Sequence, residues 1–179
     1  MQTTPASSAS AVVSRDEARA LTSRMLSFSS ADQTRVTVIS ERSGNTRFAD
    51  GSITTSGGIN DTSVTVTVTF GRRRASSSTN VLDDASLRRT VDLASRLARL
   101  APEDPELMPE LGQQSYTAVE AFVEATADLD AEARAEAIGR AIGAAMSAGK
   151  PAGTIFSAGY LEANARAIAV ATSNGLFAY

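Results

Sequence analysis

Alternating apolar and polar side chains predict a β-sheet with one apolar face. In residues 64–70, with the sequence VTVTVTF, valine or phenylalanine occupies every even position and threonine every odd one. Because successive side chains of a strand point to opposite faces, the apolar set must pack against an apolar partner. The opposite face, which carries Thr65, Thr67 and Thr69, is predicted to meet water or another chain.

The same alternation predicts five strands in the first half of the chain, over residues 33–40, 45–49, 52–55, 62–70 and 74–79. Asp50-Gly51 suits a type I′ hairpin turn, because both central positions of that turn require a positive φ. Gly57-Gly58 indicates a looser connection. Later in the chain, strands are predicted over 154–161 and 165–172, with a turn at Glu162-Ala163-Asn164.

Three amphipathic helices are predicted beside these strands. Ser14-Arg15-Asp16-Glu17 forms a capping box, and a helix should start there with an apolar stripe of Ala18, Leu21, Met25 and Phe28. A second helix is capped by Asp83 or Asp84 and buries Leu87, Val91, Ala94 and Leu97. We therefore expect an α+β domain, in which an antiparallel sheet is covered mainly on one face by about three helices.

The third helix is predicted to begin near residues 128–130. Its apolar side carries Ala135, Ile138, Ile142 and either Ala145 or Met146. Gly149 followed by Lys150-Pro151 is a strong stop signal, because glycine accepts the left-handed cap conformation and proline cannot continue the helix.

Asn174-Gly175 is a second type I′ signal, followed by four residues only. Two explanations carry equal weight. In the first, the chain is an N-terminal piece of a longer polypeptide or completes its sheet with another chain. In the second, residues 176–179 form a short final edge strand.

The composition limits the chemistry that the chain can perform. It contains no histidine and no cysteine among 179 residues, which excludes soft-metal sites, imidazole bases and a Ser-His-Asp triad. A serine–lysine pair remains conceivable, but Lys150 is better explained as a cation at a helix end. Binding of a metal by oxygen ligands alone stays open, although no calcium-loop spacing is present.

The charge and hydropathy of the chain favour no nucleic-acid or membrane partner. The net charge is −3 and no apolar run approaches the length of a membrane span. Residues 1–13 lack the pattern of a secretory signal and are predicted to be a disordered leader. A cytoplasmic location is the default expectation. Arg72-Arg73-Arg74 is predicted to be a solvated hairpin tip that opposes aggregation, in preference to a site for acidic peptide, partner or nucleic acid.

Several segments, in order, resemble the N-terminal domain of the TldD/PmbA family, also called modulators of DNA gyrase. The resemblance covers nearly everything after residue 14. The segments that carry it are NTRFADG at 45–51, GRRRASSSTN at 71–80, LAPEDP at 100–105, EAT at 124–126, AGY at 158–160 and ATSNGL at 171–176.

The resemblance implies a metallopeptidase that acts on unfolded peptides. It implies a zinc site in the C-terminal domain of TldD-type subunits, in a His-Glu-x-x-x-His helix, and a PmbA (TldE)-type subunit that lacks the site. This sequence has no such motif, so we expect no catalytic residue, no cofactor-binding residue and no metal ligand in this chain. Residues 14–179 are expected to be the N-terminal domain, continuing into a C-terminal domain absent from this chain.

The expected function is therefore a non-catalytic one in subunit assembly and in shaping the substrate chamber. The expected partners are unfolded peptide and a family subunit, in a homo- or heterodimer. Thr65, Thr67 and Thr69 are the peptide-contact candidates, because an extended peptide can add to a sheet by backbone hydrogen bonds. A solvated threonine face is the favoured alternative. The other function considered is a peptide-binding or scaffold module of a catalytically silent subunit with no peptidase role.

Overall fold

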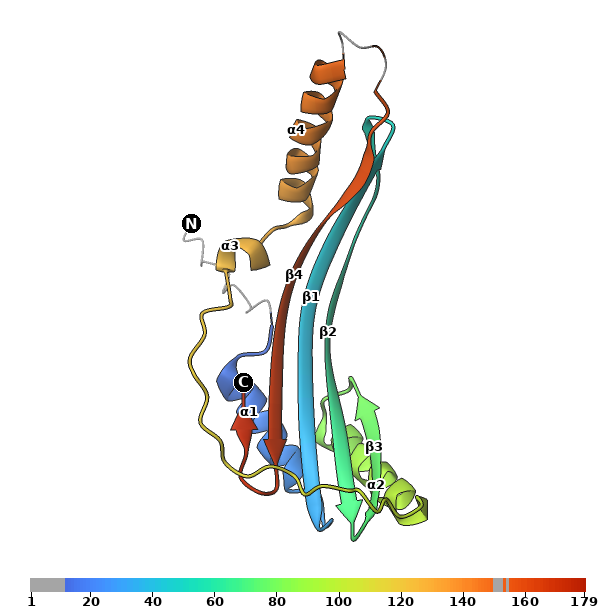
Figure 1. Cartoon of the computed structure of the whole chain (residues 1–179), viewed down its shortest axis with the longest axis vertical. Coiled ribbons are helices and arrows are strands. Elements are labelled where there is room, and N and C mark those ends of the chain that lie inside the picture. Colours follow the sequence, from blue (N-terminus) through green and yellow to red (C-terminus); the bar gives the residue numbers. More distant parts are fainter. Residues whose placement is uncertain (1–11, 150–152, 154) are drawn as a thin grey trace, which may run out of the picture. The chain divides into compact units, whose positions relative to one another are not determined.

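The computed structural model describes residues 12–149, 153 and 155–179 (Figure 1). Within these residues the helices are α1 (Arg15–Leu26), α2 (Asp84–Leu100), α3 (Glu124–Ala127) and α4 (Ala131–Gly149). The strands are β1 (Gln33–Ala49), β2 (Ser52–Phe70), β3 (Arg73–Thr79), β4 (Ala158–Thr172) and β5 (Phe177–Ala178). They form one antiparallel sheet in the order β3-β2-β1-β4-β5, so the predicted α+β class is confirmed.

The chain divides into two compact units. Among the described residues, the first unit contains 41–60 and 120–165 and the second contains 12–40, 61–119 and 166–179. Strands β1, β2 and β4 each contribute residues to both units. The predicted leader at residues 1–13 falls almost wholly outside the described residues, as do Lys150 and Pro151 of the predicted helix stop.

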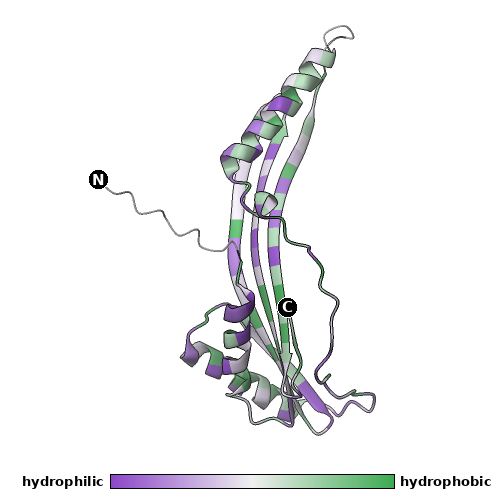
Figure 2. Cartoon of the chain, turned by 90° about the vertical axis from the view of Figure 1, so that its left-hand side faces the viewer, coloured by the Kyte–Doolittle hydropathy of each residue, from purple (hydrophilic) through white to green (hydrophobic). Residues whose placement is uncertain are grey.

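The second unit holds the apolar core that the alternation predicted. Its buried side chains come from α1, α2 and the even-numbered positions of β1 and β2, and α1 and α2 lie on the same face of the strands (Figures 1 and 2). The fully buried larger members are Met25, Val36, Val38, Val64, Val66, Val68, Leu87 and Val91. The apolar face of the strands thus packs against the apolar sides of the two amphipathic helices, and both are buried by this contact.

The two helices of this core begin where their caps predicted. The Ser14 hydroxyl accepts from the Glu17 amide, and the Glu17 carboxylate accepts from the Ser14 amide, which completes the capping box of α1. Asp83 caps α2 by accepting from the Ser86 amide at 2.9 Å. The expected burial of Leu97 is wrong: it is 44% exposed, and Ala98 takes the core position instead. The stripe advances by four residues from Ala94, not by three.

The predicted breaks inside the strands are wrong. β1 continues through residues 41–44, β2 continues through Gly57-Gly58, and β4 continues through Glu162-Ala163-Asn164. In β2, residues 52–60 are all exposed, so no burial pattern marks them as strand. Hydrogen bonding to neighbouring strands overrides the weak local preference of glycine and asparagine.

The two predicted turns differ in their geometry. Asp50-Gly51 joins β1 to β2 with φ of 54° and 75°, which confirms the type I′ turn. At the second turn only Gly175 has a positive φ, so the turn exists but type I′ is wrong there. β5 follows it and pairs antiparallel with Val170 and Ala171, which forms the short final strand that was one of the two explanations.

In the first unit, α4 packs beside β1, β2 and β4. Its inward residues are Arg134, Ile138 and Ile142. The expected positions Ala135 and Ala145 are half-buried and Met146 is exposed. Burial of an arginine in place of an apolar residue was not predicted, and this side chain occupies the centre of the site described below.

Candidate functional site

The predicted peptide-contact threonines lie on the face of β2 opposite the valine core. Thr65 and Thr67 share hydrogen bonds with Ser78 and Ser76 of β3, at 2.9 and 2.8 Å. Thr67 and Thr69 are only 6% and 1% exposed, so the favoured expectation of a solvated face is wrong for them. Contact between these threonines and peptide stays a prediction.

An extended stretch, residues 101–119, crosses the strands on this face and is called here the crossing segment (Figure 1). Its central anchor is Glu110, whose amide donates to Gln33 Oε1 at 2.6 Å. The Glu110 carboxylate pairs with Arg74 at 3.1 Å and with Arg35 at 3.5 Å. Because Val36 and Ala75 pack in the core, the neighbouring arginines point to the opposite face, where the crossing segment lies.

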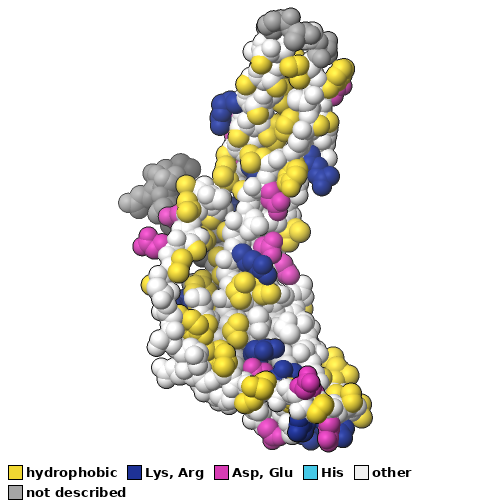
Figure 3. Space-filling view, viewed as in Figure 1, with side chains coloured by type: hydrophobic (Ala, Val, Ile, Leu, Met, Phe, Trp, Pro, Cys, Tyr) yellow, Lys and Arg dark blue, Asp and Glu magenta, His cyan; other side chains and the backbone are white. Residues whose placement is uncertain are grey.

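The three arginines of the β2–β3 hairpin all bind the crossing segment. Arg72 Nε donates to the Asp104 carbonyl, Arg73 donates to the Ala101 carbonyl, and Arg74 donates to the Met108 carbonyl. Figure 3 shows basic and acidic side chains side by side in the lower part of the view, where the β2–β3 hairpin lies. The tip is solvated at Gly71 and Arg72, as expected, but the prediction missed that the hairpin arginines also hold a loop in place.

The first unit contains a hollow of about 570 Å³ between its strands and the start of α4. Its walls come from 42–44 of β1, 56–60 of β2, 127–134 around α3 and α4, and Ala163 of β4. Most of the lining is small or uncharged. The charged members are Arg42, Asp130 and Arg134.

Arg134 is held against β1 by two hydrogen bonds. Its Nε donates to Thr46 Oγ1 at 3.3 Å and its Nη1 donates to the Leu129 carbonyl at 2.8 Å. The residue is 6% exposed. A Cβ at Gly44 would collide with the guanidinium, so glycine at this position leaves the space that the arginine occupies.

Asp130 serves the helix more than the hollow. Its carboxylate accepts from the Ala133 amide at 2.8 Å, as an N-cap aspartate does. No carboxylate of the described residues lies within ion-pair distance of Arg134. The hollow therefore presents a buried cation whose charge this part of the chain does not neutralise.

The described residues do not fit a zinc site. They include no group of three or more potential ligands close enough to hold a metal ion, and the sequence has neither histidine nor cysteine. No helix in the described part of the chain is long and apolar enough to cross a bilayer.

Comparison with known protein families finds one family that part of the chain matches. Residues 35–98 match the family model described as PmbA/TldA metallopeptidase domain 1. The matched segment spans less than half of the chain and is similar to the first domain of the TldD/PmbA family. The resemblance in the sequence is thereby confirmed, and the match covers the core strands together with most of α2. Comparison with curated protein sequences gives no match.

Solved structures with the same fold belong to longer chains. The chain resembles TldE from Thermococcus kodakarensis, with a TM-score of 0.79 and 13% identity over 89% of this chain. It also resembles a proposed modulator of a DNA gyrase from Thermotoga maritima, with a TM-score of 0.73 and 15% identity over 89% of this chain. It spans 35% and 36% of those two chains, and at these identities the likeness shows the fold.

Sequence reasoning missed both Glu110 and Arg134. Glu110 lies in a stretch without periodicity, and only its acidic character beside three hairpin arginines could have suggested a pairing. Arg134 interrupts the inward stripe of α4 four residues before Ile138, which is the one local sign that it points inward.

Proposed function

We propose that this chain is the non-catalytic N-terminal domain of a TldD/PmbA-like metallopeptidase that degrades or processes unfolded peptides. Its role is to contribute to subunit assembly and to the chamber that receives the substrate. The match of residues 35–98 to a domain of that family carries the proposal. The absence of histidine and cysteine from the sequence supports a non-catalytic role, because the zinc ligands must then come from elsewhere.

An open strand edge in the first unit supports a role in holding another chain. Among the described residues, β3 pairs with Val64–Phe70 of β2, and the stretch 52–60 has no strand on its outer side. Residues 52–60 are all exposed and carry no charge and no proline. Unpaired backbone groups of this kind accept an added strand, either an extended peptide or a segment of a partner subunit.

The second candidate is a scaffold or peptide-binding module of a catalytically silent PmbA (TldE)-type subunit. The likeness to TldE, with a TM-score of 0.79, supports it. The two candidates differ in the zinc motif of the gene product that contains the domain. Both candidate functions include a cytoplasmic location and a homo- or heterodimer with a family subunit.

The test is peptide hydrolysis by the natural gene product that contains this chain, alone and with a family partner subunit. We expect a chemically unfolded protein to be cleaved, and cleavage to stop when zinc is chelated. The isolated 179-residue chain should cleave nothing. Cleavage by the isolated chain, or no cleavage by the gene product with its partner, would contradict the first candidate.

A variant of the open edge tests the assembly role directly. Thr55→Lys places a charge on the edge, which opposes strand addition, and Thr55→Ser is the matched control. We expect the lysine variant to lower kcat/KM for unfolded protein or to weaken subunit association, measured by light scattering. Wild-type values for both quantities would remove the edge from the proposal.

A further inference from the structure

Arg134 places a positive charge in the wall of a hollow without a negative partner from the described residues. A buried charge that lacks a counter-charge is unfavourable unless hydrogen bonds or a ligand compensate it. Two hydrogen bonds to uncharged oxygens hold Arg134 in place, but they leave its charge unpaired. We propose that the hollow binds a carboxylate through the Arg134 guanidinium.

Arg134 lines the hollow and keeps donors that no described residue accepts from. A guanidinium has five N–H donors, and the described residues accept two of them, one from Nε and one from Nη1. Nη2 makes no hydrogen bond to the described residues, yet no buried side-chain nitrogen or oxygen among them lacks a partner. Nη2 is therefore not fully buried, and since Arg134 lines the hollow, a ligand oxygen there can accept from it.

The two Nη groups of the fork suit a ligand with two acceptor oxygens, such as a carboxylate. Planar guanidinium groups bind carboxylates with two parallel hydrogen bonds, which is stronger and more directional than pairing with a single oxygen. Thr46 and Leu129 fix the orientation of the fork, so little side-chain entropy is lost when a ligand binds.

The charges of the lining favour a ligand with one negative charge. Arg42 and Arg134 oppose one carboxylate, that of Asp130, which leaves a single positive charge in excess. A monocarboxylate brings the hollow to neutrality, whereas a doubly charged phosphate would leave an excess negative charge beside Asp130.

The source of the carboxylate follows from the proposed function, on which this step rests. An unfolded peptide offers a C-terminal carboxylate and acidic side chains. A hollow of about 570 Å³ lies within the usual range of ligand sites, roughly 300 to 1,000 Å³. It accommodates the end of a peptide, with small residues against Gly57, Gly58 and Ala163.

Isothermal titration of the 179-residue chain with three peptides tests the inference. The peptides are acetyl-penta-alanine with a free carboxylate, the same peptide as its amide, and the amide with one central glutamate. We expect the free acid to bind at least tenfold more tightly than the amide, since a hydrogen bond to a charged group contributes that much or more. Equal affinity for acid and amide would overturn the proposal. Binding of the glutamate peptide at the strength of the acid identifies side-chain carboxylates as an equal source.

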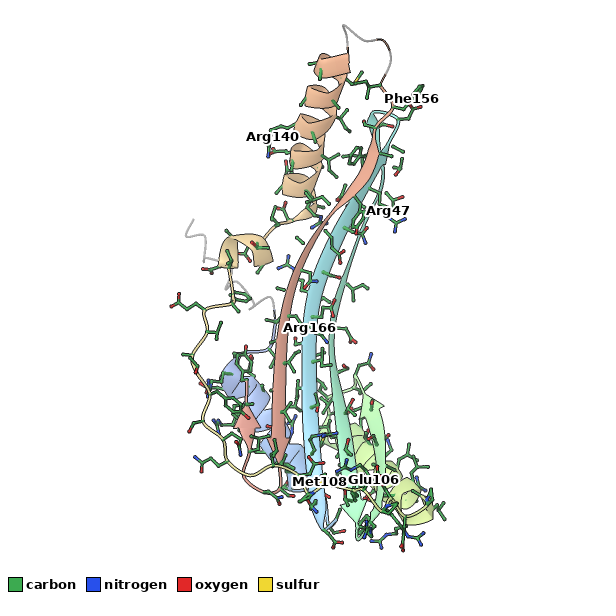
Figure 4. All side chains as sticks on the ribbon, viewed as in Figure 1. Arg47, Glu106, Met108, Arg140, Phe156 and Arg166 are labelled. Carbon is green, nitrogen blue, oxygen red and sulfur yellow. The ribbon has the colours of Figure 1, made fainter. Side chains whose placement is uncertain are left out.

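Two arginines of α4 form a matched pair of variants. Arg140 lies on the outer side of the same helix with its side chain 74% exposed (Figure 4). Arg134→Met should abolish the preference for the free acid, and Arg140→Met should leave it unchanged. If Arg140→Met removes the preference as fully as Arg134→Met, nonspecific charge is the cause and the proposal fails.

Circular dichroism would show whether Arg134→Met loses the helix. If it does, Arg134→Lys is the variant that tests carboxylate binding by the guanidinium. Lysine keeps the charge and the stem but not the fork, so we expect a loss of about tenfold in affinity for the acid with the fold retained. Wild-type affinity in this variant would contradict carboxylate binding by the fork. Titration requires no peptidase activity, so a gene product that cleaves peptide while this chain shows no acid preference would overturn this inference alone.

Discussion

Replacement of Glu110 by glutamine should loosen the crossing segment and lower the free energy of unfolding by about 2 kcal/mol. The Glu110 side chain is 7% exposed and pairs with Arg74 at 3.1 Å and Arg35 at 3.5 Å. Glutamine keeps the size and one acceptor oxygen, so the substitution removes the charge with little change in packing.

The magnitude follows from the exposure of the partners. A hydrogen bond to a charged group contributes roughly 1.5 to 3 kcal/mol. Loss of one partner from a fully buried pair costs more, roughly 3 to 5 kcal/mol, because the other charge stays desolvated. The side chains of Arg35 and Arg74 are 40% and 32% exposed, so water can replace the lost carboxylate and the smaller range applies.

Glu103→Gln is the matched control. Glu103 also joins the crossing segment to a hairpin arginine, Arg73, at 3.4 Å, but its side chain is 62% exposed. Exposed pairs contribute little, so we expect a change of less than about 0.5 kcal/mol. The measurement is urea unfolding at low and high salt, together with amide hydrogen exchange over residues 104–112. Equal effects of the two substitutions would refute the argument that burial sets the strength of the Glu110 anchor.

Three further outcomes follow from the fold. Leu87→Ala should destabilise by about 2 to 5 kcal/mol and Leu97→Ala by less than about 1 kcal/mol, measured by thermal unfolding, because only the first side chain is fully buried. Gly51→Ala should destabilise by about 1 kcal/mol because φ is +75° there, whereas Gly57→Ala should not, since its added Cβ meets open space. The backbone hydrogen bond from Ser86, followed by that of its hydroxyl, lowers the pKa of Asp83 from 3.8. The ionised cap therefore stabilises the fold at pH values above the ordinary pKa of aspartate. The loss of stability caused by Asp83→Ala should disappear as the pH falls through the lowered pKa of Asp83.

The core could be predicted from the sequence because its signal is local and redundant. The alternation of Val64, Val66 and Val68 predicts a half-buried strand, and the Ser14 capping box predicts the start of a helix that covers it. Leu97 was misassigned because both the third and the fourth residue after Ala94 are apolar. Which of them faces the core depends on the crossing of the helix over the strands, and the sequence of the helix does not specify that angle.

The site residues are less predictable because their partners are distant in sequence. Arg134 meets Thr46 across 88 positions, and Glu110 meets Gln33 across 77. No periodicity links such pairs. The breaks predicted in β4 have a different cause: Ala163 is buried while its neighbours are exposed, so the period of two was present but Glu162 and Asn164 suggested a turn.

Several features of the first unit support the proposal that it binds another chain. The second unit contains the buried apolar core, with Met25 and Leu87 among its members, but it also exposes large apolar side chains such as Leu100, Met108 and Val119. The first unit likewise exposes large apolar side chains, among them Ile59, Phe156 and Tyr160, and its edge stretch 52–60 of β2 carries no charge. Exposed apolar residues near unpaired strand edges are stabilised by binding, not by further folding. Arg134, which has no ion-pair partner among the described residues, adds a specific polar group to this unit, so the open edge and the arginine together support the proposed binding of a peptide or a subunit there.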